Sequence, residues 1–139
     1  MVGPTPVSSQ AIELAMLRNF NNLKTALPDF EWFHLEEVRK LALEYGPRVD
    51  RAGAPLLTVT IEVGCTTPSA PAVITLVLEG VRQLSLPELG GRVLELSEIE
   101  FMSVDDQGLE DLRYMLNDPG SGLSCYFADG EVRLARSEK

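Results

Sequence analysis

Two apolar segments in the middle of the chain constrain the fold more than any other feature. In the first, apolar and polar residues alternate, and the second is apolar almost throughout. In residues 56–64 (LLTVTIEVG), every second residue from Leu57 to Val63 is apolar, and the residues between them are Thr or Glu. This alternation predicts a half-buried strand. Residues 72–81 are apolar on both sides, which is typical of a central strand. Because only the short loop 66–71 joins the two, they must pair antiparallel, since parallel pairs need a long crossover.

The C-terminal half continues the β pattern. In residues 92–104 (RVLELSEIEFMSV), the apolar positions change parity near Ser97–Glu98, which predicts a bulge or a change of strand. Residues 117–122 (NDPGSG) are the strongest turn signal in the chain and predict strands on both sides. Asp129–Gly130 predicts a two-residue hairpin before the last strand.

The N-terminal region predicts a helix. Residues 1–9 are rich in Pro, Ser and Gly and should form a flexible arm. Ser8 or Ser9 can then cap a helix that ends before Pro28, because the residue before a proline is disfavoured in the α region. Apolar residues recur at helical spacing along this segment: Ile12, Ala15, Met16, Phe20, Leu23 and Leu27.

Residues 34–45 fit two patterns. Leu35, Val38 and Ala42 have helical spacing, and the high content of Leu, Glu, Lys and Ala favours a helix. Leu41, Leu43 and Tyr45 instead alternate with Ala42 and Glu44, as in a strand. The residues alone leave both open. Residues 46–55 contain Gly, Pro and Asp and predict a turn.

These elements predict the α+β class: a twisted antiparallel meander of about five to seven strands with the N-terminal helix packed on one face. We expect an arm at 1–9, a single domain at 10–136 and a solvated tail at 137–139, because 139 residues are too few for two ordinary domains. The expected core consists of Phe20, Leu23, Leu57, Val59, Ile61, Leu76, Leu78, Leu112, Tyr114, Cys125 and Phe127.

The charge and the cysteines of the chain argue against several classes of function and location. The chain has 21 acidic and 12 basic residues, a net charge of −9, which disfavours nucleic acid as a partner. No apolar run reaches the roughly 20 residues of a membrane helix, and no secretory signal opens the chain, so we expect a cytoplasmic protein away from membranes. Cys65 and Cys125 fit no metal-binding spacing and should be buried, unbridged thiols.

No pattern for catalysis is present. His34 is the only histidine and has no recognisable nucleophile motif beside it, so we expect it to be partly buried or in a turn. No glycine-rich phosphate loop occurs. The acidic run at 104–111 (VDDQGLED) lacks the spacing of a calcium loop. The sequence therefore predicts a non-enzymatic protein with no catalytic residues, cofactor or metal.

The acidic residues are concentrated in one part of the chain. Eight lie between Glu95 and Asp118, and only Arg113 opposes them. Such a segment can be a solvated edge that keeps a sheet protein in solution, or a negative surface that steers a basic partner. For the second hypothesis the candidate partner-binding residues are Glu95, Glu98, Glu100, Asp105, Asp106, Glu110 and Asp111, with Trp32 and Tyr114 as aromatic anchors.

Two short motifs and the order of the strands suggest a family. Phe33-His34-Leu35-Glu36 precede an apolar stretch, the strand TVTIEV follows, and Leu78-Glu79-Gly80-Val81 end a central strand. In these features the chain resembles the small immunity proteins of bacterial polymorphic-toxin systems, in particular immunity protein family 50. The resemblance implies a strand in the second half of 34–45. It also implies a non-enzymatic cytoplasmic protein that binds a cognate toxin and blocks it.

Two other functions compete with this one. The chain could be an accessory or scaffold domain that forms a homodimer through an open sheet edge. It could also be a small-molecule-binding protein with carboxylates in a cleft between sheet and helix.

Overall fold

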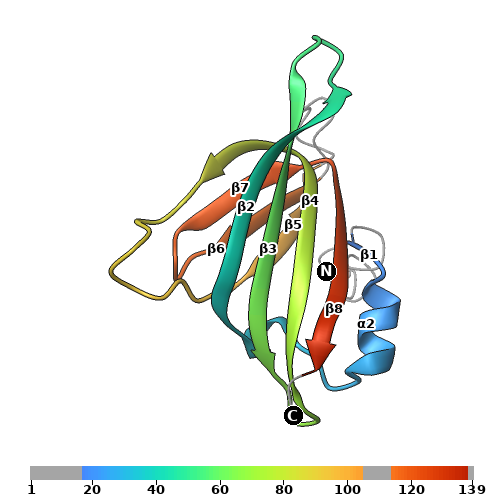
Figure 1. The fold of residues 1–139 in the computed structure, drawn as a ribbon, viewed down its shortest axis with the longest axis vertical. Coiled ribbons are helices and arrows are strands. Elements are labelled where there is room, and N and C mark those ends of the chain that lie inside the picture. The colour runs from blue at the N-terminus through green and yellow to red at the C-terminus, as the bar shows by residue number, and fades with distance from the viewer. Residues whose placement is uncertain (1–16, 105–113, 138–139) are drawn as a thin grey trace, which may run out of the picture.

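The computed structural model describes residues 17–104 and 114–137, and this part of the chain is mostly β-strand with one short α-helix (Figure 1). The elements in chain order are β1 (Leu17–Arg18), α2 (Phe20–Ala26), the 3-10 helix η1 (Trp32–His34), β2 (Leu35–Val49), β3 (Pro55–Thr66), β4 (Pro71–Ser85), β5 (Glu100–Ser103), β6 (Tyr114–Asp118), β7 (Leu123–Phe127) and β8 (Asp129–Ser137). Within the described residues, no helix is long and apolar enough to cross a membrane.

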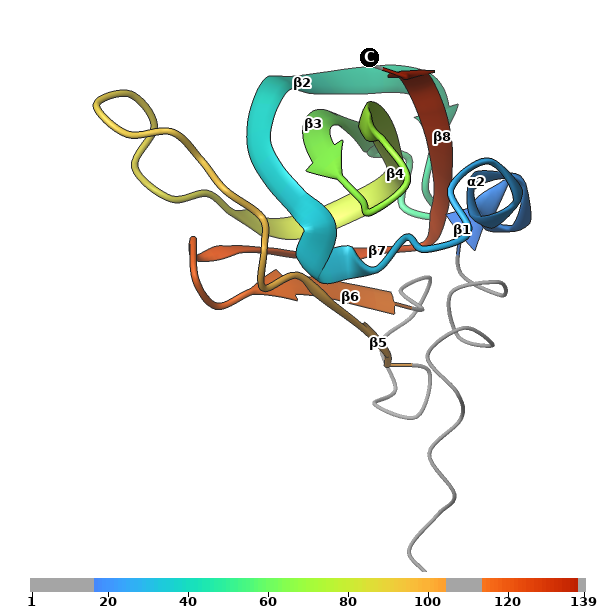
Figure 2. The ribbon, with the colours of Figure 1, turned by 90° about the horizontal axis from the view of Figure 1, so that it is seen from below.

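The strands form one curled sheet in two parts. In the first part, which we call the main sheet, β2, β3, β4 and β8 pair antiparallel in that order, and β1 adds to β8 in parallel. In the second part, the small layer, β5, β6 and β7 pair antiparallel. Viewed along the strands, the main sheet curls over the small layer, and α2 lies beside β8 (Figure 2).

Strand β4 joins the two parts. Residues 72–79 pair with β8, whereas Arg82 and Ser85 pair with β7. The partner changes at Gly80, whose φ of 67° lies in the left-handed region that favours glycine. A Cβ there would lie 3.0 Å from the Cβ of Ala128. The Ala128 amide donates to the Glu79 carbonyl at 3.0 Å, which holds the chain where it passes from β7 to β8.

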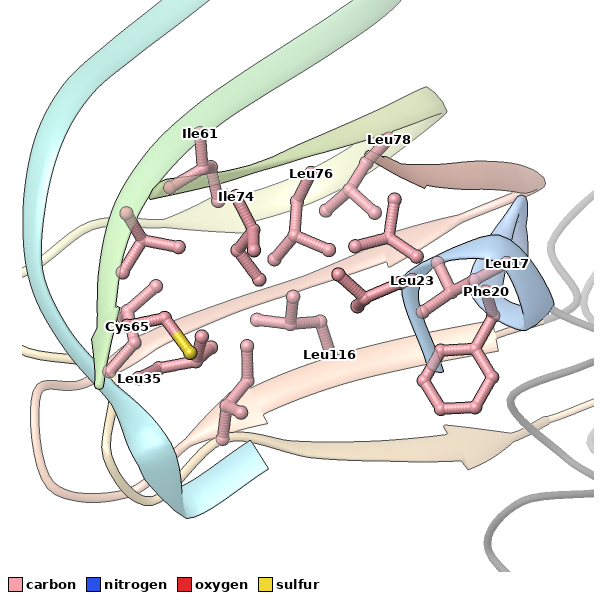
Figure 3. Packing of buried hydrophobic residues seen from close by; sticks show 14 of the residues in the cluster. Leu17, Phe20, Leu23, Leu35, Ile61, Cys65, Ile74, Leu76, Leu78 and Leu116 are labelled. Carbon is pink, nitrogen blue, oxygen red and sulfur yellow. The ribbon is translucent and has the colours of Figure 1, made fainter. Parts of the chain in front are cut away.

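The core lies between the two parts of the sheet and is completed by α2 (Figure 3). The alternation in β3 is confirmed, because Val59, Ile61 and Val63 are buried. The other expected core residues that are buried are Phe20, Leu23, Leu76, Leu78, Cys125 and Phe127. Leu57 and Tyr114 are only partly buried and pack against this cluster. Leu112 lies outside the described residues.

Residues 35–45 belong to a strand, and His34 ends η1. β2 runs from Leu35 to Val49 and pairs with β3 over most of its length. It therefore extends into the predicted turn, and the connection to β3 is limited to residues 50–54. The Asp50 carboxylate accepts hydrogen bonds from the amides of Ala52 and Ala54, both at 2.9 Å, which closes this turn. Tertiary pairing has overridden the helix propensity of the segment.

The N-terminal helix expected from Ser8 or Ser9 is not confirmed. The described helix begins at Phe20, because Leu17–Arg18 are extended against β8 and Asn19 has a left-handed φ of 67°. It ends at Ala26, close to the expected stop before Pro28. The arm at 1–9 lies outside the described residues, and β8 extends to Ser137, the first residue of the expected tail.

The predicted hairpin at Asp129–Gly130 is wrong. These residues begin β8, which leaves β7 and pairs with β4, so the strands are not one sequential meander. Eight strands are described instead of five to seven, and β1 has only two residues. Gly130 has no turn conformation. A Cβ there would lie 2.8 Å from the Leu17 side chain, where β1 packs on β8, so a larger residue would displace that side chain.

Candidate functional site

The segment before β2 presents an aromatic residue to solvent. Trp32 begins η1, where the amide of His34 donates to the Glu31 carbonyl at 2.9 Å. The Glu31 amide in turn donates to Nδ1 of His34 at 3.0 Å. His34 is half-buried and closes this turn, as expected from the sequence. The two hydrogen bonds fix the direction in which Trp32 and the following Phe33 leave the backbone.

Three rings hold the Trp32 indole. Its centroid lies 4.8 Å from Phe101 and 5.0 Å from Phe30, which meets it edge-on, and 6.0 Å from Phe20, which stacks on it. These contacts anchor the indole against the core, and the residue as a whole is half-buried. Phe33 points outward instead and is 66% exposed. The segment therefore offers a rigid indole next to an exposed phenyl ring.

Two glutamates, one just before β5 and one at its start, line the same surface as Trp32 and Phe33. Glu98 and Glu100 are exposed, and Ile99 between them is buried. The sequence predicted a bulge or a change of strand at Ser97–Glu98, but residues 92–96 form no strand of their own, and the change of parity marks a turn before β5. Asp118, which is fully buried, holds this turn in place. Its carboxylate accepts hydrogen bonds from the amides of Glu98 and Ser121, both at 3.0 Å.

Asp118 corrects part of the sequence interpretation. It is the last of the eight acids in the acidic segment, yet its carboxylate points inward and adds nothing to the surface. The physical reason is the turn at 119–122, which leaves backbone amides that a buried carboxylate can satisfy. The charge of this residue serves local structure.

Together these residues form a concave site, which we call the Trp32 hollow. Its volume is about 460 Å³, and its lining consists of Glu31, Trp32, Phe33, Ser97, Glu98, Ile99, Glu100 and Pro119. Three of these residues are acidic, and none is Lys or Arg. The hollow thus combines negative charge with aromatic surface, which suits a cation carried on an apolar stem.

The other predicted site residues lie elsewhere. Glu95 is exposed and lines a neighbouring hollow with Glu88 and Arg92, which the 119–122 turn also borders. Tyr114 lines a third hollow near the end of β4. The candidates Asp105, Asp106, Glu110 and Asp111 lie outside the described residues. Of the nine candidates, the described structure groups Trp32 with Glu98 and Glu100 and separates Glu95 and Tyr114 from them.

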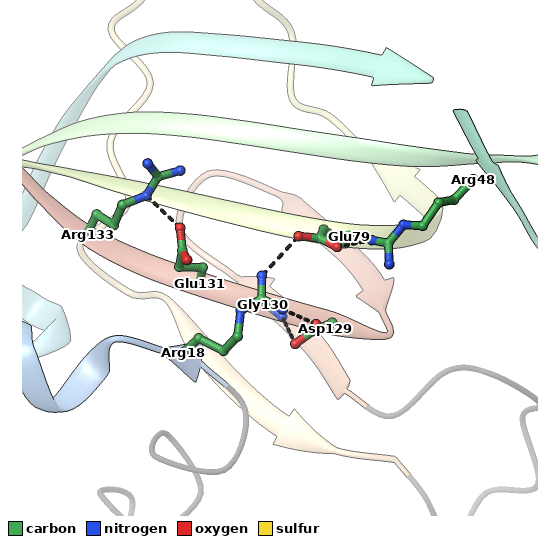
Figure 4. A network of polar contacts seen from close by, with 7 residues as sticks. All are labelled: Arg18, Arg48, Glu79, Asp129, Gly130, Glu131 and Arg133. Atoms are coloured by element: carbon green, nitrogen blue, oxygen red, sulfur yellow. Dashed lines mark hydrogen bonds and ion pairs between the residues drawn. The ribbon is translucent and has the colours of Figure 1, made fainter. Parts of the chain in front are cut away.

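The third hollow contains a charged cluster that the sequence analysis missed. The Glu79 carboxylate pairs with Arg18, at 3.0 Å, and with Arg48, while Arg18 also pairs with Asp129 (Figure 4). We call these four residues the Glu79 network. It borders a space of about 510 Å³. Its members come from β1, β2, β4 and β8, so no local motif could have revealed it.

The Glu79 network changes the titration of its central carboxylate. Burial disfavours ionisation of Glu79, but the hydrogen bonds and charges of Arg18 and Arg48 outweigh it, so the pKa of Glu79 lies below its ordinary value of 4.5. In this network each carboxylate has an arginine partner. The chemistry is that of a structural ion-pair cluster.

The two cysteines are buried and not bridged, as expected from the sequence. Burial raises the pKa of Cys65 to about 11, with a smaller contribution from Glu36, and burial raises the pKa of Cys125 to about 12. Such thiols are protonated near neutral pH and are poor nucleophiles. Within residues 17–104 and 114–137, no group of three or more His, Cys, Asp or Glu side chains is placed to hold a metal ion.

Comparisons with protein-family models, with curated proteins and with solved structures gave no significant match.

Proposed function

We propose that this chain is a protein-binding domain that receives a basic side chain of its partner in the Trp32 hollow. One observation carries the proposal: Glu31, Glu98 and Glu100 line the same hollow as the half-buried Trp32, and no Lys or Arg of the described residues lines it. The contrast with the Glu79 network supports it, because there the carboxylates are paired within the chain.

The hollow fits a lysine or arginine for two reasons. The indole face attracts a cation, and such contacts contribute about 0.5–2 kcal/mol depending on how far the cation is desolvated. The carboxylates then supply ion pairs and hydrogen bonds to the charged head group. The aliphatic stem of the same side chain can pack against Phe33, which is 66% exposed at the rim.

Long-range charge adds to this local fit. The chain carries a net charge of −9, so a basic partner is attracted before contact is made. Steering of this kind raises association rates by about 10–1000-fold at low salt and is screened at high salt. The partner is therefore expected to bind with a rate that depends strongly on ionic strength.

The partner could be a toxin, as the family resemblance implies. The first resembling motif, Phe33-His34-Leu35-Glu36, spans the end of η1 and the start of β2, and its Phe33 lines the Trp32 hollow. The role proposed for the chain is then that of an immunity protein that occupies a basic surface of a cognate toxin without catalysing a reaction.

Two matched charge reversals test this function. Glu98→Lys with Glu100→Lys changes the hollow, and Glu88→Lys with Glu95→Lys makes the same change in net charge at the neighbouring hollow. A partner is first captured from the lysate of the source organism, identified and purified, and its association rate is measured against salt. We expect the first variant to lose binding and the second to lose only part of the rate. Equal losses, or no loss in either variant, would contradict the proposal.

A further inference from the structure

Strand β2 forms one edge of the main sheet (Figure 1). One side of it pairs with β3. On its other side, the Val38 amide donates to the Leu94 carbonyl at 2.7 Å, and the Leu96 amide donates to the Glu36 carbonyl at 3.1 Å. Among the described residues no backbone partner continues this pairing from residue 40 to residue 46. That stretch is an open sheet edge.

The open edge carries exposed apolar side chains. Leu43 and Tyr45 are 50% and 70% exposed. Their cross-strand partners are Val59 and Leu57, so they point to the same face of the sheet as the core residues of β3. The core does not extend far enough to cover them. An unpaired edge with uncovered apolar residues is the usual place for a further strand to add.

The charges of this edge are self-complementary. If a second copy pairs antiparallel about a two-fold axis at Ala42, Lys40 of each chain faces Glu44 of the other, and Leu41 faces Leu43. Lys40, Ala42 and Glu44 share one face, opposite Glu62, Thr60 and Thr58 of β3, so the ion pairs and the leucine pairs lie on separate faces. The arrangement gives two ion pairs and two leucine pairs.

Other registers lack this match. Residues that oppose each other in an antiparallel pair point to the same face of the sheet. The two-fold axis must therefore pass through a residue, and the alternatives to Ala42 are its neighbours. With the axis at Leu41 or Leu43, neither Lys40 nor Glu44 meets an opposite charge. With the axis at Glu44, that residue faces itself and Lys40 faces Arg48. Cross-strand pairs of opposite charge stabilise a sheet and like charges destabilise it, so the axis at Ala42 is favoured.

The residues that bound the open edge are compatible with a two-fold axis at Ala42. On one side the edge is already occupied at Val38 by the bond to Leu94. On the other side Pro47 has no amide to donate. With the axis at Ala42, Val38 faces Gly46, so pairing stops before Pro47 in both chains. Residues 40–44, which pair with one another about Ala42, therefore all lie within the open stretch of residues 40–46.

We propose that two copies of this chain form a dimer by antiparallel pairing of β2, with Ala42 on the two-fold axis. The paired stretch shares no residue with the Trp32 hollow, so the dimer is compatible with one basic partner on each copy. The inference does not depend on the function proposed above.

A cysteine at the axis tests the register. In the proposed dimer the two Ala42 residues face each other within disulfide distance. The two Lys40 residues are offset by four positions, about 13 Å, which is too far for a bridge. Mild oxidation should therefore give a covalent dimer of Ala42→Cys and none of Lys40→Cys. The buried native cysteines do not interfere. Cross-linking of Lys40→Cys alone, or of neither variant, would overturn the register.

Charge reversal tests the dimer itself. Glu44→Lys places two like-charged pairs in the interface and should weaken dimerisation roughly tenfold or more in sedimentation equilibrium. Glu44 faces Thr58 in its own sheet, so the change adds no like-charge pair within the monomer. Lys40→Glu combined with Glu44→Lys should restore the dimer. A wild-type chain that sediments as a monomer throughout the micromolar range, or a double variant without recovery, would contradict the proposal. Circular dichroism verifies the fold of each variant.

Discussion

The main sheet and the small layer share one core but are built differently. The strands β2, β3, β4 and β8 of the main sheet have 9 to 15 residues, whereas β5, β6 and β7 have four or five. The long strands bury regular rows of apolar side chains, including Ile61, Leu76 and Leu78. The small layer adds a shorter apolar surface and depends on a single buried carboxylate, Asp118, to hold its turns.

If the Trp32 hollow binds a partner as we propose, this difference separates the part of the molecule that provides stability from the part that binds. The main sheet supplies most of the buried apolar residues, while the start of the small layer contributes two of the three glutamates of the Trp32 hollow, Glu98 and Glu100. Loops and short elements on a rigid scaffold are where binding residues generally lie. The predictions below test this division, beginning with the largest expected effect.

Truncation of the core should have the largest effect in both parts. Leu76 in β4 and Leu116 in β6 are both fully buried and belong to the same cluster. Changing either to Ala should lower the free energy of unfolding by roughly 2–5 kcal/mol, through lost burial and the cavity that remains. Denaturant titration measures both. If Leu116→Ala costs much less than Leu76→Ala, the small layer is an appendage and not part of one core.

Removal of the Asp118 carboxylate should have the next largest effect. Asp118→Ala leaves the amides of Glu98 and Ser121 without their acceptor and should cost about 3 kcal/mol, because hydrogen bonds to buried charged groups are strong. Asp118→Asn keeps an acceptor oxygen and should cost less. Chemical denaturation compares the two. Equal stability of both variants and the wild type would show that this carboxylate does not hold the turns.

The sequence predicted β3 and β4 because their signal is local and repeated. The alternation from Leu57 to Val63 and the apolar run at 72–81 each contain the whole pattern of a strand. Asp129–Gly130 misled the prediction for the opposite reason. The Leu17 side chain, more than 100 positions away in the chain, packs closely on the glycine there, and a local pattern cannot contain that contact.

The candidate site was predicted in its residue types but not in its grouping. Charge density identified Glu98 and Glu100, and aromatic character identified Trp32. The sequence could not show that Asp118 turns inward while Glu98 stays outside, because this depends on backbone amides that only the folded turn leaves unpaired. The Glu79 network was missed because its four strands meet only in the folded sheet.

The Glu79 network should contribute little stability, and its contribution should depend on pH. Glu79→Gln should cost about 1 kcal/mol or less near neutral pH, because Arg18 and Arg48 are about half exposed or more. The folded pKa of Glu79 is lowered, so its contribution is present above its ordinary value of 4.5 and is lost as the pH falls through the folded value. Unfolding measured against pH should show the wild-type and Glu79→Gln curves converging in acid. A constant difference would contradict this assignment.

The two thiols should have the smallest effect at neutral pH and a growing effect in alkali. The folded pKa values of Cys65 and Cys125 are raised to about 11 and about 12, so both thiols stay protonated in the native protein up to high pH. In the unfolded chain they ionise near the ordinary value of 9.0. The folded state then binds more protons than the unfolded state, so stability falls as the pH rises above about 9 and the loss from Cys65 levels off near 11. Cys65→Ala and Cys125→Ala, each compared with the wild type by unfolding at pH 7 and at pH 10, should show less of this alkaline loss. The reactivity of the two thiols gives a second test. A thiol reagent should find two free groups in the denatured, non-reduced protein and should react slowly with the native protein. Rapid reaction of the native protein at neutral pH would mean that the layers separate readily, because Cys65 in β3 and Cys125 in β7 are both covered only while the main sheet and the small layer stay in contact.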